Sequence, residues 1–82
     1  MNITVKLFSY FSQLLPKGTE NYAVAVEAAA GARVRDVLTP FGVPLKECRL
    51  IILNGTVRTD TEYALDMELT EGDTVAILPN VH

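Results

Sequence analysis

The sequence has very little cysteine and histidine, and this shortage excludes several kinds of site. Its 82 residues include one cysteine, Cys48, and one histidine, His82. One cysteine cannot form a disulfide within the chain, and it cannot supply the four thiolates of an iron–sulfur cluster. We therefore expect a reducing, cytoplasmic setting. No set of residues has the spacing of a metal site, because His82 lacks fixed companions.

Two further features are missing: a cluster of basic residues and a long apolar run. Seven Lys and Arg residues are scattered along a chain with ten acidic residues and a net charge of −3. They form no basic cluster of the kind that binds nucleic acid. No apolar stretch approaches the roughly 20 residues that span a bilayer, and Met1 is not followed by the pattern of a signal peptide. We expect neither a nucleic acid nor a membrane as a partner. The acidic net charge favours a partner protein with a basic face.

The chain is long enough for one small domain, which we place at residues 1–82. Residues 2–8 and 22–28 both alternate between polar and apolar positions, which is typical of half-buried strands. Because a turn-rich loop joins them, we expect an antiparallel pair. The residues expected on the inner faces of these strands are Ile3, Val5, Leu7, Tyr22, Val24 and Val26.

The period then changes from two to that of a helix. The apolar residues of this segment fall at Val34, Val37, Leu38 and Phe41, a spacing that predicts one buried stripe. We expect the helix to end near Pro40, which lacks a donor and clashes one turn back. Its start is predicted to be poorly capped, because Arg33 stands where a Ser, Thr or Asp would contribute about 1 kcal/mol.

The second half of the chain predicts a hairpin and a last strand. The apolar run 50–53 meets Asn54-Gly55, a pair that suits a tight hairpin turn, and its continuity predicts a strand covered on both faces. A polar connection then leads to a strand over 74–79. The predicted fold is an α+β domain with a mixed five-stranded sheet, one main helix on one face, and the first and last strands paired in the middle.

The order and spacing of four segments resemble a known family. These segments are "VKLF", "GARVRDVL", "ILNG" and "LTEGDTVAILP". They are similar to the small sulfur carriers of the ubiquitin-like β-grasp type, namely the molybdopterin synthase small subunit and the thiamin sulfur carrier (MoaD/ThiS). The resemblance covers essentially the whole chain.

The resemblance implies a carrier that is not itself an enzyme and binds no cofactor. In such carriers a flexible tail, here residues 79–82, leaves the last strand. A ubiquitin-activating-like enzyme uses ATP to adenylate the terminal carboxylate, which becomes a thiocarboxylate. The sulfur is then delivered to the molybdopterin synthase large subunit or to a thiazole synthase-like partner. The pathway served would be molybdopterin or thiamin biosynthesis.

One departure from the family pattern concerns the tail. Family tails end in two glycines, which have no Cβ and can thread a narrow tunnel, whereas this sequence reads Pro79-Asn80-Val81-His82. Four interpretations stay open. The protein may continue to the diglycine, or the fold may be an interaction or regulatory module that carries no sulfur. The carboxylate of His82 itself may be the activated group, or the domain may be an appendage of a larger enzyme.

Apolar residues beside the tail are the candidates for partner binding. Strand parity places Phe8 and Leu78 on the sheet face away from the helix. The resemblance places these two, together with Val57, in an apolar patch that docks on the partner enzyme, and adds Pro79, Asn80 and Val81 as contacts of the tail. Two other features have structural interpretations: Cys48 is expected to be a partly buried residue, and the carboxylates between 60 and 73 a solvated acidic rim.

Overall fold

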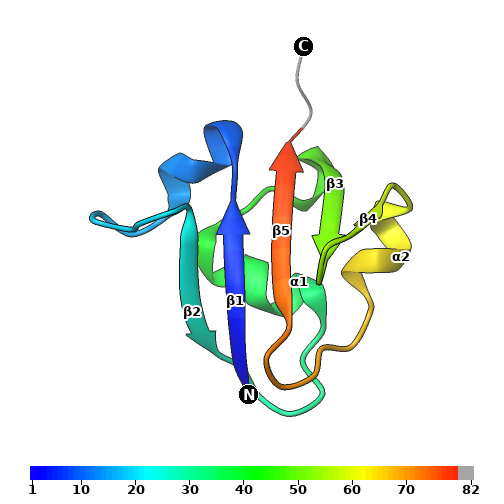
Figure 1. Ribbon diagram of the computed structural model, residues 1–82. Helices are drawn as coiled ribbons and strands as arrows, with labels where there is room; N and C mark the ends of the chain where they lie inside the picture. The colour runs from blue at the N-terminus through cyan, green and yellow to red at the C-terminus, as the bar shows by residue number, and fades with distance from the viewer. Residues whose placement is uncertain (80–82) are drawn as a thin grey trace.

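The computed structural model describes residues 1–79 and contains a five-stranded mixed sheet (Figure 1). The strands are β1 (Asn2–Leu7), β2 (Ala23–Glu27), β3 (Cys48–Leu53), β4 (Thr56–Arg58) and β5 (Thr74–Pro79). Their order across the sheet is β2-β1-β5-β3-β4, with β1 and β5 parallel in the centre and the other pairs antiparallel. The predicted fold class and the central pairing of the first and last strands are confirmed.

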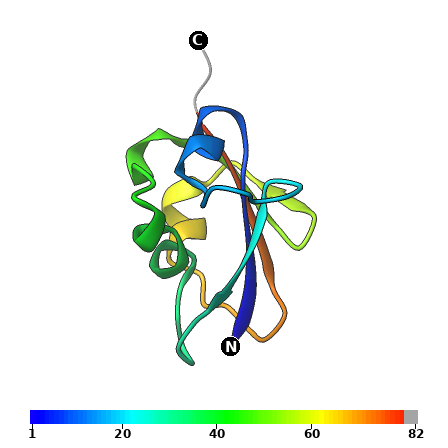
Figure 2. The ribbon, with the colours of Figure 1, turned by 90° about the vertical axis from the view of Figure 1, so that its left-hand side faces the viewer.

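The helices are short and lie on one side of the sheet (Figure 2). They are the α-helices α1 (Val34–Leu38) and α2 (Thr61–Leu65) and the 3₁₀ helices η1 (Ser9–Leu14), η2 (Thr39–Phe41) and η3 (Leu45–Glu47). No helix in the described part of the chain is long and apolar enough to cross a membrane. The main helix ends before Pro40, as predicted, and Gly42 terminates η2 with φ 74°, a left-handed conformation that glycine adopts without strain.

The hydrophobic core lies between the sheet and the two α-helices. Alternate residues of the strands point into it, because successive side chains of a strand face opposite sides. The core residues from the strands, each at most 1% exposed, are Ile3, Val5, Leu7, Ile51, Val75 and Ile77. The helices cover them with Val34, Val37, Leu38, Ala64 and Leu65. The predicted inner faces of β1 and β5 and the helix stripe at 34, 37 and 38 are thus confirmed.

The start of α1 is better satisfied than the sequence predicts. The backbone N–H of Arg33 donates to Oδ2 of Asp36 at 2.8 Å, so a carboxylate in the first turn compensates for the missing cap. The Arg33 guanidinium lies 3.5 Å from Oε1 of Glu68 and also donates to the carbonyl of Asp66. The expectation of a poorly capped start was wrong because Asp36, three residues further along, satisfies the first turn, while residues 66 and 68 bind the Arg33 side chain.

Two local expectations were also wrong. The connection after β4 contains α2, whose buried residues Ala64 and Leu65 are adjacent in the sequence and so show no helical spacing. Tyr22 does not continue the inner face of β2, because Asn21 and Tyr22 have φ of 55° and 60° and form a turn before the strand begins. Tyr22 is consequently 54% exposed.

The predicted hairpin turn is confirmed and is fixed to the start of β5. Asn54 and Gly55 have φ of 51° and 85°, as a two-residue hairpin requires. The Asn54 amide donates to Asp73 at 2.9 Å, and its oxygen accepts from the N–H of Thr74 at 2.8 Å. Asp73 also accepts from the N–H of Thr70 at 2.8 Å, so this clamp of Asn54 and Asp73 holds the β3–β4 hairpin against β5.

Candidate partner-binding face

The sheet face turned away from α1 and α2, which we call the open face, carries a group of apolar side chains. Figure 2 shows no helix on this side of the sheet. The residues of β1, β3 and β5 that alternate with the core positions must point to it. The apolar patch on the open face consists of Phe8, Leu50, Ile52, Val57 and Leu78.

Strand register brings these residues together in two adjacent rows. In the upper row, Leu50 is the partner of Leu78, and Phe8 continues β1 beside it because its N–H donates to the carbonyl of Ile77 at 3.2 Å. In the lower row, Ile52 is paired on one side with Val57 of β4 and on the other with Ala76 of β5.

The lower row also contains a cation and a buried methyl group. Lys6 pairs with Ala76 from the β1 side and is the cationic residue within the row. Ala76 is buried, because its short side chain stands between the longer ones of Lys6 and Ile52. Val57 at the far end of the row is 56% exposed. The open face therefore offers partly exposed apolar area that no described element covers.

Sequence reasoning found three of the five residues of the apolar patch. Phe8, Val57 and Leu78 do lie on the open face, with Val57 separated from Leu78 by β3. The expectation that β3 is covered on both faces was wrong, because helices cover the face of Ile51 alone and Leu50 and Ile52 stay half-buried. An apolar run reads the same whether a second layer or a binding partner covers it.

An aromatic pair extends the apolar patch toward β2. The rings of Phe8 and Tyr22 are 5.4 Å apart between centroids and tilted by 45°, a favourable arrangement for two aromatic side chains. Tyr22 holds this position from a left-handed backbone conformation, which costs a bulky residue about 1–2 kcal/mol. Strain of this kind is found where a side chain has a function to fulfil.

The end of β5 lies beside the apolar patch. Pro79 is paired with Cys48 and is buried, so its expected place in a flexible tail was wrong: it is the last residue of the strand. The other predicted tail residues, Asn80, Val81 and His82, lie outside the described residues. The described part of the chain therefore ends at the edge of the open face, next to Leu78.

Cys48, which is paired with Pro79 at this end of the sheet, is the titratable residue whose reactivity has to be considered first. Burial, with a smaller contribution from Glu47, raises the pKa of the Cys48 thiol to about 11, so the thiol stays protonated at neutral pH and is a poor nucleophile. This agrees with its interpretation as a structural residue. Among residues 1–79, no group of three or more metal-ligating side chains occurs.

The predicted acidic rim is more ordered than the sequence suggests. Asp60 pairs with Arg58 at 2.8 Å, and the guanidinium lowers the pKa of this carboxyl. Asp66 pairs with Arg35 at 2.8 Å. These carboxylates are exposed, as expected, but they connect elements on the helix side and leave the open face to apolar groups.

Comparison with protein families gives a match over the whole chain. The family model described as Mut7-C ubiquitin matches residues 1–82. Among curated proteins, none matches this chain.

Solved structures give further matches that cover nearly all of the chain. A protein from Pyrococcus furiosus described as molybdopterin converting factor, subunit 1, is 29% identical, with a TM-score of 0.66 over 98% of both chains. Small archaeal modifier protein 1 of Haloferax volcanii is 20% identical, with a TM-score of 0.69 over 98% of both chains. A complex of subunits 1 and 2 of molybdopterin-converting factor from Helicobacter pylori gives 21% identity and a TM-score of 0.58, covering 100% of this chain and 97% of the other. The chain is thus a MoaD/ThiS-like β-grasp protein.

Proposed function

The chain belongs to the Mut7-C ubiquitin family, and on that premise we propose that it is a sulfur carrier of the molybdopterin type, with thiamin biosynthesis as the other pathway. The observation that carries the proposal is the position of the apolar patch. Its upper row, Phe8, Leu78 and Leu50, lies beside the end of β5. A partner that covers the patch therefore receives the segment after Pro79 in its own active site.

The proposed chemistry takes place at the C-terminal carboxylate and not on the folded body. An adenylating enzyme transfers AMP from ATP to the carboxylate, which makes it an acyl donor with a good leaving group, and a sulfur nucleophile then displaces AMP to give a thiocarboxylate. No catalytic group is required from the domain. The protonated, buried Cys48 is consistent with this, because the thiol cannot compete as a nucleophile.

Two partners follow from the proposal. One is the adenylating enzyme, and the other is a large subunit that accepts the sulfur. A second subunit as partner is supported by the similar Helicobacter pylori structure, which is described as a complex of subunits 1 and 2 of molybdopterin-converting factor. Leu50, Ile52 and Val57 would form the centre of the contact, since fully desolvated apolar residues contribute most of the binding energy of an interface. Both partners would use the open face in turn.

The alternative is an interaction or regulatory module that binds a partner and carries no sulfur. The apolar patch runs from residue 8 to residue 78 and is complete without the tail, which supports this alternative equally well. Docking therefore cannot distinguish the two functions, whereas sulfur transfer can.

The test is an intact-mass measurement after incubation with the adenylating enzyme, ATP and sulfide. Two proteins are compared: the 82-residue chain and the same chain with Gly-Gly added after His82. We expect the extended chain to gain the mass difference between one sulfur and one oxygen. The variant Leu78→Asp, which leaves the buried core residues unchanged and places a charge in the apolar patch, should lose this modification.

The outcomes separate the two functions. Sulfuration of either chain supports the carrier, and sulfuration of the extended chain alone places the reacting carboxylate on glycines that follow residue 82. If neither chain is sulfurated while both still bind the adenylating enzyme or the large subunit, the carrier proposal is wrong and the module remains.

A further inference from the structure

The outer edge of β2 has backbone groups with no partner in the described part of the chain. Leu7 donates to the carbonyl of Tyr22, and Ala28 donates to the carbonyl of Met1. Both are directly opposed pairs of the β1–β2 register, so the residues between them bond to β1 at every second position. The intervening residues, Ala25 and Glu27, therefore point their N–H and C=O groups away from the sheet.

The two edges of the sheet differ in how they are protected. The opposite edge is β4, which has only three residues and is bent back by the Asn54–Gly55 turn, and short edge strands discourage strand pairing. By contrast, β2 has five residues, without proline, lysine or a bulge. Only Glu27 is charged. This edge is open to an additional strand.

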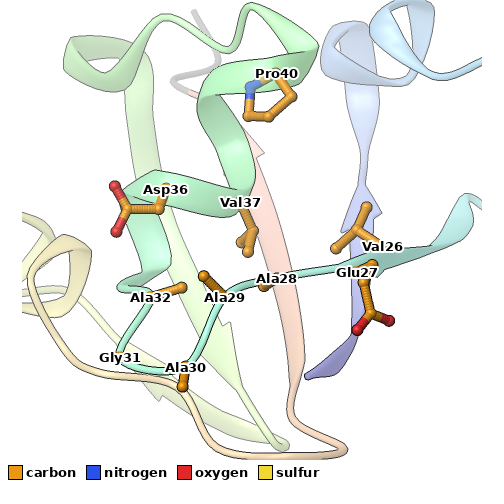
Figure 3. A pocket seen from close by; sticks show the side chains of 10 residues that line it. All are labelled: Val26, Glu27, Ala28, Ala29, Ala30, Gly31, Ala32, Asp36, Val37 and Pro40. Atoms are coloured by element: carbon orange, nitrogen blue, oxygen red, sulfur yellow. The ribbon is translucent and has the colours of Figure 1, made fainter.

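A groove lies beside this edge on the side of α1 (Figure 3). It has a volume of about 410 Å³ and is lined by segment 26–32, Asp36, Val37 and Pro40. Val26 of β2 and Val37 of α1 lie on either side of it, with the alanine-rich loop 28–32 between them. The small alanine side chains leave this space, and a strand added to β2 would direct every second side chain toward it.

The charges of the groove select the chemistry of the partner. Glu27 and Asp36 are its charged lining residues, and no Lys or Arg lines it. The Glu27 side chain is 78% exposed and lies 3.3 Å from the N-terminal ammonium group. Asp36 accepts from the backbone N–H of Arg33. The groove therefore favours aliphatic side chains accompanied by basic ones.

We propose that the β2 edge binds an extended segment of a partner protein by strand addition, and that this segment has aliphatic residues at alternate positions and Lys or Arg near its ends. Backbone hydrogen bonds to Ala25 and Glu27 would supply affinity, and the groove would select the side chains. In the sheet, β1 lies between β2 and β5. The proposed site on β2 is therefore separated from the end of β5. One partner could occupy it while another holds the open face.

The test uses a synthetic peptide, acetyl-KVTVTVK-amide, titrated into the ¹⁵N-labelled chain and followed by amide chemical shifts. We expect the largest shifts at Ala25 and Glu27, and none at Thr56 or Arg58 on the opposite edge. The peptide acetyl-EVTVTVE-amide, with the charges reversed, should bind at least tenfold more weakly.

The decisive variant is Ala25→Pro, compared with Ala25→Ser. Proline removes an N–H that points outward, so no bond within the sheet is lost, and peptide affinity should fall at least tenfold; serine keeps the N–H and should bind as the wild type does. A second arm leaves the protein unchanged. N-methylation of the peptide amides that face β2 should abolish binding, and methylation of the alternate amides should not.

Three results would overturn the proposal: shifts centred on Lys6 and Ala76 of the open face, equal binding of both N-methylated peptides, or a dimer of the chain alone that Ala25→Pro dissociates. The last result, measured by sedimentation, would assign the edge to a second copy. Sulfuration of Ala25→Pro should equal that of the wild type, so the outcome is independent of the proposed function.

Discussion

The two faces of the sheet are built from the same strands, yet they differ in what their side chains do. On the covered face, Ile51 and Ile77 are fully buried against the helices. On the open face, their neighbours Ile52 and Leu78 remain partly exposed. A shift of one residue along a strand thus separates a residue that stabilises the fold from one that is available to a partner.

This difference in burial between the two faces shows how a small domain combines stability with binding. One helix layer covers only one face of a sheet, so a second apolar face is not required for folding. An exposed apolar group beside a chain end therefore indicates an interface more than a packing defect. If this is right, changes on the covered face should alter stability, and changes on the open face should alter binding.

The largest effect is expected for Ile51→Ala, compared with Ile52→Ala on the same strand. Ile51 is fully buried, so its truncation should lower the free energy of unfolding by about 2–5 kcal/mol. Truncation of half-buried Ile52 should cost about 1 kcal/mol or less. Urea denaturation measures both. Equal losses of unfolding free energy would mean that the two faces contribute alike to stability, which would contradict the proposed difference between them.

The next effect concerns affinity and uses Leu78→Asp. A carboxylate in the upper row of the apolar patch would be desolvated by the partner, so binding to the large subunit should weaken at least tenfold, or about 1.4 kcal/mol. Calorimetric titration measures this. The control is Thr56→Asp, which is paired with Leu53 and so lies on the other face of the sheet; it should bind normally, and equal weakening by both would indicate a general charge effect.

The sequence predicts the covered face well because its signals are periodic. Alternation in β1 and β5 and the helical spacing of Val34, Val37 and Leu38 each identify residues that must be buried together. The Asn54–Gly55 pair fixes the hairpin, since both residues need positive φ. These local signals predict two pairs of strands joined by a helical crossover, and the first and last strands then pair in the middle of the sheet.

The open face is harder to predict, for physical reasons that concern particular residues. The run at 50–53 does not distinguish a strand buried on both sides from one that has a binding face. Tyr22 has the parity of an inner residue, but the positive φ of Asn21 and Tyr22 changes its direction, and no glycine marks that turn. The buried residues of the helix α2, Ala64 and Leu65, are adjacent in the sequence and so show no helical spacing.

A smaller effect is expected where the two faces meet, at the Asn54–Asp73 clamp. Partial burial raises the pKa of Asp73, but hydrogen bonds from the Thr70 N–H, the Asn54 amide and the Thr70 hydroxyl together lower it below 3.8. The folded state thus favours the carboxylate. The clamp contributes stability above the unfolded pKa, and this contribution is lost as the pH falls through the lower folded value.

Asp73→Asn should therefore cost about 1 kcal/mol at neutral pH, because one of the donors loses its acceptor, and should flatten the acid side of the stability curve. Amide exchange at Val57 should accelerate, while that at Val5 in the central strand should not. Denaturation at several pH values and exchange by NMR measure these effects. An unchanged acid dependence would exclude Asp73 as the titrating group.

The smallest effect on stability concerns Tyr22 and Phe8. Replacing Tyr22 by Asn removes the ring contact, worth about 0.5–1.5 kcal/mol, but also relieves a left-handed conformation that Asn tolerates. The two effects oppose each other, so the stability of Tyr22→Asn should stay within about 1 kcal/mol of the wild type. In a Phe8→Ala background only the relief remains, and the same replacement should stabilise the protein.

The difference between the effects of Tyr22→Asn in the two backgrounds separates a strained interface residue from an ordinary surface residue. If the Tyr22 ring gains no stability from its contact with Phe8, the replacement has the same effect in both backgrounds and the double-mutant cycle gives no coupling. If the ring is held on Phe8 at the expense of backbone strain, the coupling is about 0.5–1.5 kcal/mol. Binding of the large subunit should then weaken for Tyr22→Asn although stability hardly changes, because the strain preserves a contact surface and not the fold.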